Sequence, residues 1–423
     1  MFMEVKNIAE ELKERGLVEQ EGGGAMKEFL SEKRTVYLGI DPTADSLHVG
    51  NMVSVILMRH LSDAGHDIVF IVGGGTGMIG DPRESGERTL LDPEIITANT
   101  RAIRAQLEKI FGEKKFEIRN DAEWLSRLGI IGFLRDVGKH FTVNQLVKRE
   151  IIKKRLEAED PLSFTEFAYS LLQAYDYLHL YKEHHVDLQV GGSDQWTNII
   201  SGVELIRRVT GGVSYALTTP IIVDKKSGKK FGKSEGNAVW IDPKKTSPFA
   251  FYQFWINAPD DGVSEYLKIF TLLSLSEIAD VVAEHSKDVS KRSGQKKLAY
   301  EVTKLIHGEE AAKLAEQVSA VVFGEGSFTR LDAKGVDFLI KGMPGATYTV
   351  VEVKSGVGIT DALLKANLAT SKSEGRRLVE GKGVSINDAS VETPEYLLTS
   401  EAFASGAALL RVGKKVALLS IGE

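Results

Sequence analysis

The sequence contains no cysteine in its 423 residues. The chain therefore cannot form disulfides, use a thiol nucleophile or bind zinc through cysteine. It also lacks any run of about 18 apolar residues, the length that a membrane-spanning helix needs. Positive charge is not in excess either, because the formal net charge is −6. These absences argue against a globally basic nucleic-acid binder, and any site for a polyanion must be local.

The composition is that of a globular protein with room for two or three domains. Hydrophobic residues make up 43% and charged residues 26% of the chain, and both values are ordinary for such proteins. The first sixteen residues are amphipathic and of mixed charge, without the apolar core of a signal peptide or the acid-poor character of a transit peptide. We therefore expect a cytoplasmic protein that does not bind a membrane.

Short apolar runs alternate with helical periodicity in the first half of the chain. They predict buried strands at 35–41, 67–72 and 186–190, and helices at 48–65 and 194–209, the second with Asp194 as its N-cap. Strand–turn–helix units in this order predict an α/β fold with a parallel sheet. Ligands of such folds bind beyond the carboxyl ends of the strands, so the glycine-rich turns there are the candidate site.

The second half of the chain has a different pattern. It is helical from about residue 246 to 320, then mixes glycine, proline and short β-prone runs, and ends in a tail with short helices and strand-like pieces. We therefore predict an α/β domain at 1–225, an α-helical domain at 226–323, a linker with some structure at 324–355 and a small α+β domain at 356–423.

Two glycine-rich turns suggest phosphate chemistry. "GTGMIG" (75–80) matches the dinucleotide fingerprint of dehydrogenases, but that function needs a helix that starts near residue 78, and Asp81-Pro82 follow instead. Asp81 is a candidate to hold a ligand amine. "GKKFGKS" (228–234) is one residue short of a P-loop. By pattern alone it is a solvated lysine-rich turn, and the alternative is a phosphate loop of another kind.

Three polar residues share one face of a predicted helix. Tyr169, Gln173 and Asp176 lie at positions i, i+4 and i+7, after a capping box formed by Ser163 and Glu166. By pattern alone this is a wet surface stripe. The alternative is a site that also takes its polar groups from the strand–turn–helix junction at Gln189, Asp194 and Gln195. Such neutral groups suit a polar small molecule, for example a sugar or an amino acid.

Four motifs and the tail together carry a resemblance to a known family. "YLGIDPTADSLHVGN" resembles the first signature of class I aminoacyl-tRNA synthetases, with His48–Asn51 as its HIGH-like tetrapeptide, and "KFGKS" resembles the second, KMSKS. With "SLLQAYDYLHL", "GGSDQWTN" and a tail similar to the S4 RNA-binding domain, the chain resembles the bacterial-type tyrosyl-tRNA synthetases over essentially its whole length. The segments are 37–51, 170–180, 191–198, 230–234 and 356–423.

The resemblance implies a fold and a reaction. The α/β domain would be a Rossmann-like catalytic domain, followed by an anticodon-recognition domain and an S4-like domain. The enzyme would join L-tyrosine to ATP, release pyrophosphate, and transfer the tyrosyl group to tRNA(Tyr). ATP is then a substrate that brings Mg²⁺ through its phosphates, because the sequence offers no dedicated carboxylate cage. No metal-ligating residue and no tightly bound cofactor are expected.

The same resemblance implies the site residues. The catalytic set is Thr43, His48, Asn51, Lys230 and Lys233, and the ATP site adds Gly39, Asp41, Gly50, Gly192, Asp194 and Ser234. Tyr37 and Asp176 would meet the phenol hydroxyl of tyrosine, while Asp81, Tyr169, Gln173 and Gln195 complete its site. A site that pairs a hydroxyl rejects phenylalanine, because its buried polar groups would lose their partner.

RNA and partner contacts follow from the resemblance as well. In the tail, Ser371 and Glu374 predict a helix start, and the basic residues expected to bind RNA are Lys372, Arg376, Arg377 and Lys382. Residues 291–308 are basic and could meet the anticodon arm. Residues 133–155 would support a homodimer, and without the resemblance they are a basic amphipathic surface.

Some residues depart from the family pattern, and other functions stay open. Asn51 replaces the final histidine of the tetrapeptide, although an asparagine can still donate a hydrogen bond. The roles of four residues stay open: Arg83, Arg88, Asn120 and Asp121. The alternatives are the related tryptophan enzyme, which has no need of a Tyr37–Asp176 pair, and a synthetase-derived RNA-binding protein without catalytic activity.

Overall fold

The computed structural model describes residues 7–82, 91–223, 233–234, 237–324, 326–343, 345–404 and 406–422, with backbone alone at 233, 234 and 237. The chain forms two compact units. The first consists of Met1–Asp242 and Ser264–Val282, and the second of Pro243–Val263 and Ala283–Glu423.

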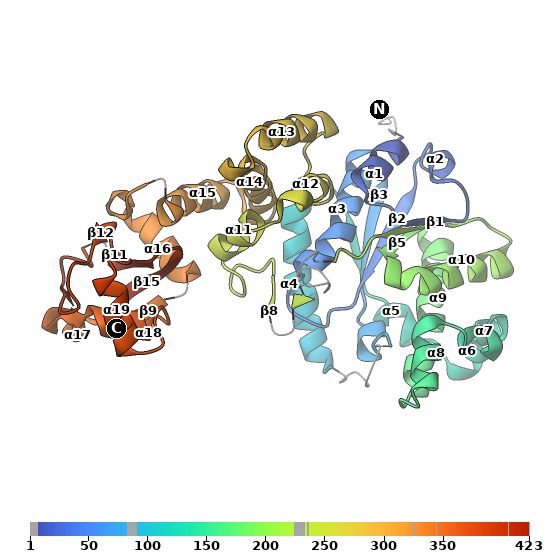
Figure 1. The fold of residues 1–423 in the computed structure, drawn as a ribbon. Helices are drawn as coiled ribbons and strands as arrows, with labels where there is room; N and C mark the ends of the chain where they lie inside the picture. The colour runs from blue at the N-terminus through green and yellow to red at the C-terminus, as the bar shows by residue number, and fades with distance from the viewer. Residues whose placement is uncertain are drawn as a thin grey trace. The chain divides into compact units, whose positions relative to one another are not determined.

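A six-stranded sheet forms the centre of the first unit (Figure 1). Its order is β1-β6-β5-β2-β3-β4, and every neighbouring pair is parallel except β1 with β6. The predicted parallel α/β fold is therefore confirmed. The strands are β1 Gln20–Gly22, β2 Thr35–Ile40, β3 Asp67–Val72, β4 Glu117–Arg119, β5 Leu188–Gly192 and β6 Tyr215–Thr219.

Helices cover both faces of this sheet (Figure 1). On one face α3 (Val49–Asp63) packs against β2, β3, β5 and β6. On the other face, Tyr37, Val69 and Ile71 join the core beneath α9 (Phe164–His184) and α10 (Trp196–Thr210). The other helices of this unit are α1 Ala9–Arg15, α2 Met26–Phe29, α4 Pro93–Phe111, α5 Ala122–Leu125, α6 Ile130–Asp136, α7 Val143–Leu146 and α8 Glu150–Glu157.

The two helices that matter most for the site have clear local causes. α9 starts at the predicted capping box, in which the Ser163 hydroxyl accepts from the Glu166 amide and the Glu166 carboxylate accepts from the Ser163 amide. α10 begins two residues later than expected. Asp194 is not its N-cap, because residues Ser193–Gln195 form a 3₁₀ turn and Gln195 occupies that position.

The glycine turn after β3 does not open a helix of the dinucleotide-binding kind. Thr76–Met78 form a single 3₁₀ turn, and residues 79–82 that follow are not helical. A Cβ on Gly74 would lie 2.2 Å from the Asn120 side chain. The turn is therefore compact because it packs against a neighbouring segment, and within the described residues it lacks the helix that the dehydrogenase fingerprint needs.

The second unit begins with helices that pack on one another. α11 (Pro248–Ile256) contacts α14 (Ser293–His307) and α15 (Glu309–Phe323). Two further helices contain residues of both units, α12 Val263–Phe270 and α13 Leu275–Lys287. This region is helical, as its sequence pattern suggests.

The second unit ends in a five-stranded sheet of order β12-β11-β14-β15-β9. Its strands are β9 Gly345–Thr349, β11 Val384–Ile386, β12 Ala389–Ser390, β14 Ala407–Val412 and β15 Lys415–Gly422, and its helices are α16 Ala333–Gly342, α17 Val350–Ser355, α18 Ile359–Lys365 and α19 Lys372–Glu380. β9 and α17 lie in the segment expected to be a linker, and β9 pairs in parallel with β15. The domain limits taken from the sequence stay a prediction.

Four short strands form two pairs outside these sheets, β10 (Val357–Gly358) with β13 (Leu397–Leu398) and β7 (Lys233–Ser234) with β8 (Asn237–Ala238). Among the helices of the described residues, none is long and apolar enough to cross a lipid bilayer.

Candidate active site

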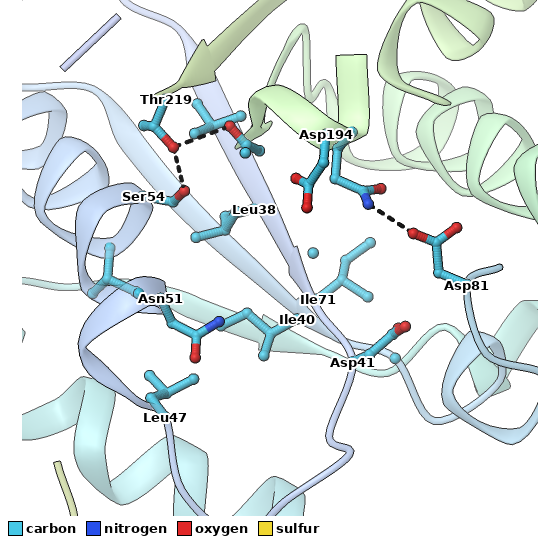
Figure 2. A pocket seen from close by; sticks show the side chains of 18 of the residues that line it. Leu38, Ile40, Asp41, Leu47, Asn51, Ser54, Ile71, Asp81, Asp194 and Thr219 are labelled. Atoms are coloured by element: carbon cyan, nitrogen blue, oxygen red, sulfur yellow. Dashed lines mark hydrogen bonds between the residues drawn. The ribbon is translucent and has the colours of Figure 1, made fainter. Parts of the chain in front are cut away.

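A cavity of about 530 Å³ lies at the carboxyl edge of the six-stranded sheet (Figure 2). Its walls come from the ends of β2, β5 and β6, the turn after β3, the first turns of α3, and α9. The strand order reverses between β2 and β5, which is where α/β folds bind ligands. The cavity therefore lies where the pattern of the first half of the chain placed the candidate site.

The structure brings most of the predicted site residues together around this cavity. Those that line it are Tyr37, Gly39, Asp41, Thr43, His48, Gly50, Asn51, Asp81, Tyr169, Gln173, Asp176, Gly192, Asp194 and Gln195. Lys230 lies outside the described residues, and Lys233 and Ser234 are described by their backbone alone. The individual roles of these residues stay predictions.

The polar stripe of α9 faces the cavity. Tyr169 and Asp176 are buried, with 5% and 4% of their surface exposed, and Gln173 lines the cavity beside them. The reading of this stripe as a wet surface is therefore wrong. Periodicity alone could not decide the point, because a face that lines a cavity and a face in open water have the same pattern.

One end of the cavity is closed by Tyr37 and Asp176. The Trp124 indole donates a hydrogen bond to Asp176 Oδ1 at 2.6 Å, and this holds the carboxylate in place. Burial raises the pKa of Asp176 well above its ordinary value, and the negative charge of Asp121 adds to the effect. Burial, followed by the charge of Asp176, also raises the pKa of Tyr37. This end therefore favours the uncharged form of both groups.

Some buried polar atoms at this cavity have no partner among the residues that the structure describes. They are the hydroxyl of Tyr37 and the side-chain carbonyl oxygens of Gln173 and Gln189. All three residues line the cavity. Buried polar groups are usually paired, because an unpaired one costs about 1–3 kcal/mol. A polar ligand in the cavity would supply the missing partners.

Carboxylates surround the next part of the cavity. The Tyr169 hydroxyl donates to Asp41 at 3.1 Å. The Gln195 amide donates to Asp81 at 2.7 Å, and this is the hydrogen bond drawn to Asp81 in Figure 2. Asn198 donates weakly to Asp81 at 3.4 Å and to Gln195 at 3.1 Å. Two carboxylates in one part of the cavity suit a cationic group such as an ammonium.

The glycine turn after β3 is fixed by Asp121, whose role the sequence left open. Its carboxylate accepts from the amides of Gly75 and Thr76, at 2.6 and 3.0 Å, and from the Thr76 hydroxyl at 2.7 Å. Thr76 also contacts Asp41 at 3.2 Å. Asp121 therefore supports the carboxylate-rich part of the cavity from behind. The Asn120 side chain accepts from the Ala122 amide at 3.0 Å, at the first residue of the adjacent short helix α5.

The other end of the cavity is formed by the first turn of α3. The Asn51 side-chain oxygen accepts from the His48 amide at 3.1 Å, so its NH₂ group is left to donate. Gly50 and Asn51 both line the cavity. The amides at the start of this 15-residue helix, with its dipole, favour an anionic group here.

The segment that follows the lysine-rich turn is attached beside this helix end. The Val49 amide donates to the Val239 carbonyl and the Ile241 amide donates to the Leu47 carbonyl, each at 3.0 Å. The rings of His48 and Trp240 lie edge to face, 6.1 Å apart. Residues 239–241, which follow the "GKKFGKS" stretch in the sequence, therefore lie next to the cavity.

Trp124 and Asn198 were missed by the sequence analysis. Trp124 lies 52 positions before Asp176, the aspartate to which it donates. Neither Trp124 nor Asn198 belongs to the polar stripe of α9. Only the fold brings them against Asp176 and Asp81, which line the cavity. Among the described residues, no group of three or more acidic or histidine side chains is placed to hold a metal ion.

The basic residues expected to bind RNA lie in the second unit. Lys372, Arg376 and Arg377 belong to α19, and they and Lys382 are exposed. Lys372 and Arg376 form ion pairs with Asp361 and Glu395. The Ser371 hydroxyl caps α19 by accepting from the Glu374 amide at 3.2 Å, as predicted, whereas the Glu374 carboxylate turns to Thr370.

Comparison with known proteins defines the class. The family model of class I tRNA synthetases (W and Y) matches residues 30–324. The solved structure of a truncated mitochondrial tyrosyl-tRNA synthetase from Coccidioides posadasii has a TM-score of 0.66 at 30% identity, covering 74% of this chain and 91% of that one. A tryptophanyl-tRNA synthetase from Encephalitozoon cuniculi shares the fold at 13% identity and a TM-score of 0.54, with 72% and 87% covered. The fold is that of a class I tRNA synthetase.

Further matches narrow the family. The model of the tyrosine–tRNA ligase SYY-like C-terminal domain matches residues 336–419. The tyrosine–tRNA ligase of Anaeromyxobacter dehalogenans is 44% identical over 97% of this chain and 98% of its own length, and that of Bacteroides thetaiotaomicron is 42% identical over 99% and 100%. The chain belongs to the tyrosyl-tRNA synthetase family.

Proposed function

We propose that this protein is a tyrosine–tRNA ligase. In the first step the tyrosine carboxylate attacks the α-phosphorus of ATP, which forms tyrosyl-adenylate and releases pyrophosphate. In the second step a ribose hydroxyl at the 3′ end of tRNA(Tyr) takes the tyrosyl group and AMP leaves. ATP as a substrate is consistent with the family to which the chain belongs.

The observation that carries the proposal is the polar closed end of the cavity. A phenol hydroxyl can accept one hydrogen bond and donate another. The buried Tyr37 hydroxyl has no partner among the described residues and is a donor, while Trp124 occupies one oxygen of Asp176 and leaves the other as an acceptor. We assign the phenol of tyrosine to this end. Phenylalanine would leave both groups unpaired, which costs binding energy.

The amino group of tyrosine would lie among the carboxylate-rich residues. Asp81, Tyr169 and Gln173 are its proposed partners, and Gln195 orients Asp81 through the 2.7 Å hydrogen bond. The substrate carboxylate is itself the nucleophile, so no activated side chain is needed. Catalysis then depends on positioning and on the stabilisation of charge on the phosphates.

ATP would lie at the α3 end of the cavity. Its proposed partners are Thr43, His48 and Asn51 near the helix start, together with Lys230 and Lys233 of the lysine-rich turn. The attachment of Val239–Ile241 beside His48 supports this placement. The ATP site would also take in Gly39, Asp41, Gly50, Gly192, Asp194 and Ser234. Mg²⁺ would arrive on the ATP phosphates and add positive charge there.

The proposal extends to partners and location. Lys372, Arg376, Arg377 and Lys382 are proposed to bind tRNA, and their exposure supports this. A homodimer is proposed through the region around 133–155, where Leu134 and Val143 are exposed apolar side chains and Ile130 and Ile131 precede them. The cytoplasmic location stays a prediction from the sequence.

Exchange of labelled pyrophosphate into ATP tests the first step. Tyrosine, phenylalanine and tryptophan are supplied separately to the full chain. We expect exchange with tyrosine alone. Exchange with tryptophan would move the function to the related enzyme, whose indole does not need Tyr37 and Asp176. Retained tRNA binding with no exchange would leave a synthetase-derived RNA-binding protein.

A further inference from the structure

A pair of hydroxyl groups lies at the α3 end of the cavity without an assigned role. Ser54 is one turn beyond Asn51 on α3, and Thr219 is the last residue of β6. Their hydroxyl oxygens are 2.8 Å apart, and the Thr219 hydroxyl also donates to the Gly191 carbonyl at 3.3 Å (Figure 2). Both residues line the cavity, and Thr219 is 1% exposed.

The donor in the bond between the two hydroxyls follows from the bond between Thr219 and Gly191. A hydroxyl has one hydrogen and two lone pairs, whereas a carbonyl can only accept. If Thr219 gives its hydrogen to Gly191, the hydrogen between the two hydroxyls must come from Ser54. The Ser54 oxygen then has no hydrogen left, and it can only accept from a ligand.

We propose that Thr219 is a positioning residue that sets the Ser54 hydroxyl as a hydrogen-bond acceptor for the nucleotide. Without Thr219, a serine at this position could turn its hydrogen to the carbonyl four residues earlier in the helix or to the ligand. With Thr219, the subsite takes a donor group of ATP, which is a ribose hydroxyl or the adenine amine. This inference rests on the proposed function, because it assigns the α3 end to ATP.

The surroundings of the pair connect it to ATP rather than to tyrosine. Ser54 lies on the same helix as Gly50 and Asn51, and Gly191 precedes Gly192 on β5. The residues proposed to contact tyrosine directly are, in contrast, on β2, on α9 and in the turn after β3. Gln195, which follows β5, acts on that site through Asp81. A change at Thr219 should therefore affect the two substrates unequally.

Pyrophosphate exchange with Thr219→Val, Thr219→Ser and a matched control, Thr218→Val, tests the proposal. Thr218 is buried on the same strand but donates to Gln20, away from the cavity. We expect Thr219→Val to raise the KM for ATP about three- to tenfold, the usual worth of one hydrogen bond, with the KM for tyrosine unchanged. Thr219→Ser keeps the hydroxyl and should restore the KM, and Thr218→Val should leave both KM values as they are.

Two further measurements separate positioning from a general structural effect. After Ser54→Ala, Thr219→Val should have little further effect on the KM for ATP, because its target is gone. ATP, 2′-deoxy-ATP, 3′-deoxy-ATP and purine riboside triphosphate are then compared. Each of the three analogues lacks one hydrogen-bond donor of ATP. The analogue without the donor that Ser54 binds should have a higher KM than ATP in the unaltered protein. In Ser54→Ala and in Thr219→Val its KM should no longer exceed that of ATP.

Several outcomes would overturn the proposal. They are equal shifts in both KM values, additive effects of the two substitutions, or an analogue profile that Ser54→Ala leaves unchanged. Absence of exchange in the unaltered protein is a different result, since it contradicts the proposed function itself. Binding of the four nucleotides by isothermal titration gives a readout that does not depend on chemistry.

Discussion

The two edges of the six-stranded sheet use buried polar side chains in different ways. At the amino edge, Arg34 donates to the Phe29 carbonyl and to Asp187, and its guanidinium lies over the Tyr215 ring. At the carboxyl edge, the Tyr37 hydroxyl and two glutamine oxygens face the cavity without a partner among the described residues.

The pairing at the amino edge is not complete. Asp187 Oδ1 and His66 Nε2 have no partner among the described residues, but neither residue lines the cavity. The difference between the edges therefore lies in what a ligand can reach. Polar groups at the amino edge stabilise the sheet. Those at the carboxyl edge are left unpaired for a ligand to bind, which costs some stability. Substitutions should separate the two roles.

The largest effect is expected from Asp176→Asn at the carboxyl edge. An asparagine that keeps the bond to Trp124 uses its only side-chain oxygen for it and turns its NH₂ group to the phenol. The phenol then loses its acceptor, so kcat/KM for tyrosine in pyrophosphate exchange should fall by about 100-fold. Because burial raises the pKa of Asp176, a neutral residue there should keep or raise the free energy of unfolding. If Asp176→Asn lowers the free energy of unfolding as much as a substitution at the amino edge does, the two edges do not have different roles.

Arg34→Met at the amino edge should show the opposite pattern. It removes an ion pair of 3.0 Å in which both side chains are largely buried, and the methionine keeps much of the apolar stem. We expect the free energy of unfolding to fall by about 2–3 kcal/mol, with kcat/KM for tyrosine unchanged. Urea unfolding and pyrophosphate exchange on the same preparation measure both. A large fall in kcat/KM would show that the edges are not separable.

Acid should weaken the amino edge through His66. Its Nδ1 accepts from the Arg34 amide at 3.1 Å, and burial, with the nearby Arg34 charge, lowers its pKa from 6.5 to about 4. Since the folded state binds the proton less readily, this contribution to stability is present above pH 6.5 and is lost as the pH falls toward 4. At pH 5 the loss is about 2 kcal/mol.

The control for the acid effect is His66→Asn. Its side-chain oxygen can still accept from the Arg34 amide, but it does not titrate between pH 7 and 5. Burial also lowers the pKa of His60 to about 4, so the variant should keep the part of the acid effect that His60 causes. If the free energy of unfolding of the variant falls between pH 7 and pH 5 by as much as that of the unaltered protein, His66 does not cause the acid effect.

The smallest effect is expected from Tyr37→Phe. It deletes one neutral hydrogen-bond donor to the phenol, so kcat/KM for tyrosine should fall by about fivefold. The same change removes a buried unpaired hydroxyl from the empty protein, so the free energy of unfolding should rise by about 1 kcal/mol. Lower stability together with unchanged kcat/KM would mean that the hydroxyl belongs to the core rather than to the substrate site.

Much of this arrangement could be predicted from the sequence. The three apolar runs gave strands because buried parallel strands are continuously hydrophobic, and the Ser163–Glu166 box gave the start of α9. The motifs at His48–Asn51 and around Asp194 lie at the turns after strands, so a single parallel sheet brings them to one edge.

Other parts could not be predicted because they depend on contacts between distant segments. Trp124 and Asp121 act on residues 45 or more positions away, and the Ser54–Thr219 pair is separated by 165 positions. Periodicity also failed to distinguish the cavity face of α9 from a wet surface. The strand β9 pairs in parallel with the last strand of the chain, which no local pattern in the expected linker indicates.

The ratio of kcat/KM for tyrosine to kcat/KM for phenylalanine, measured by pyrophosphate exchange, tests the central claim most directly. We expect a large ratio in the unaltered protein and a much smaller one in Asp176→Asn. Arg34→Met, which lowers the stability but does not change the cavity, is the control that keeps the large ratio. A small ratio in the unaltered protein, or one that Asp176→Asn does not change, would contradict the assignment of the closed end of the cavity to the phenol.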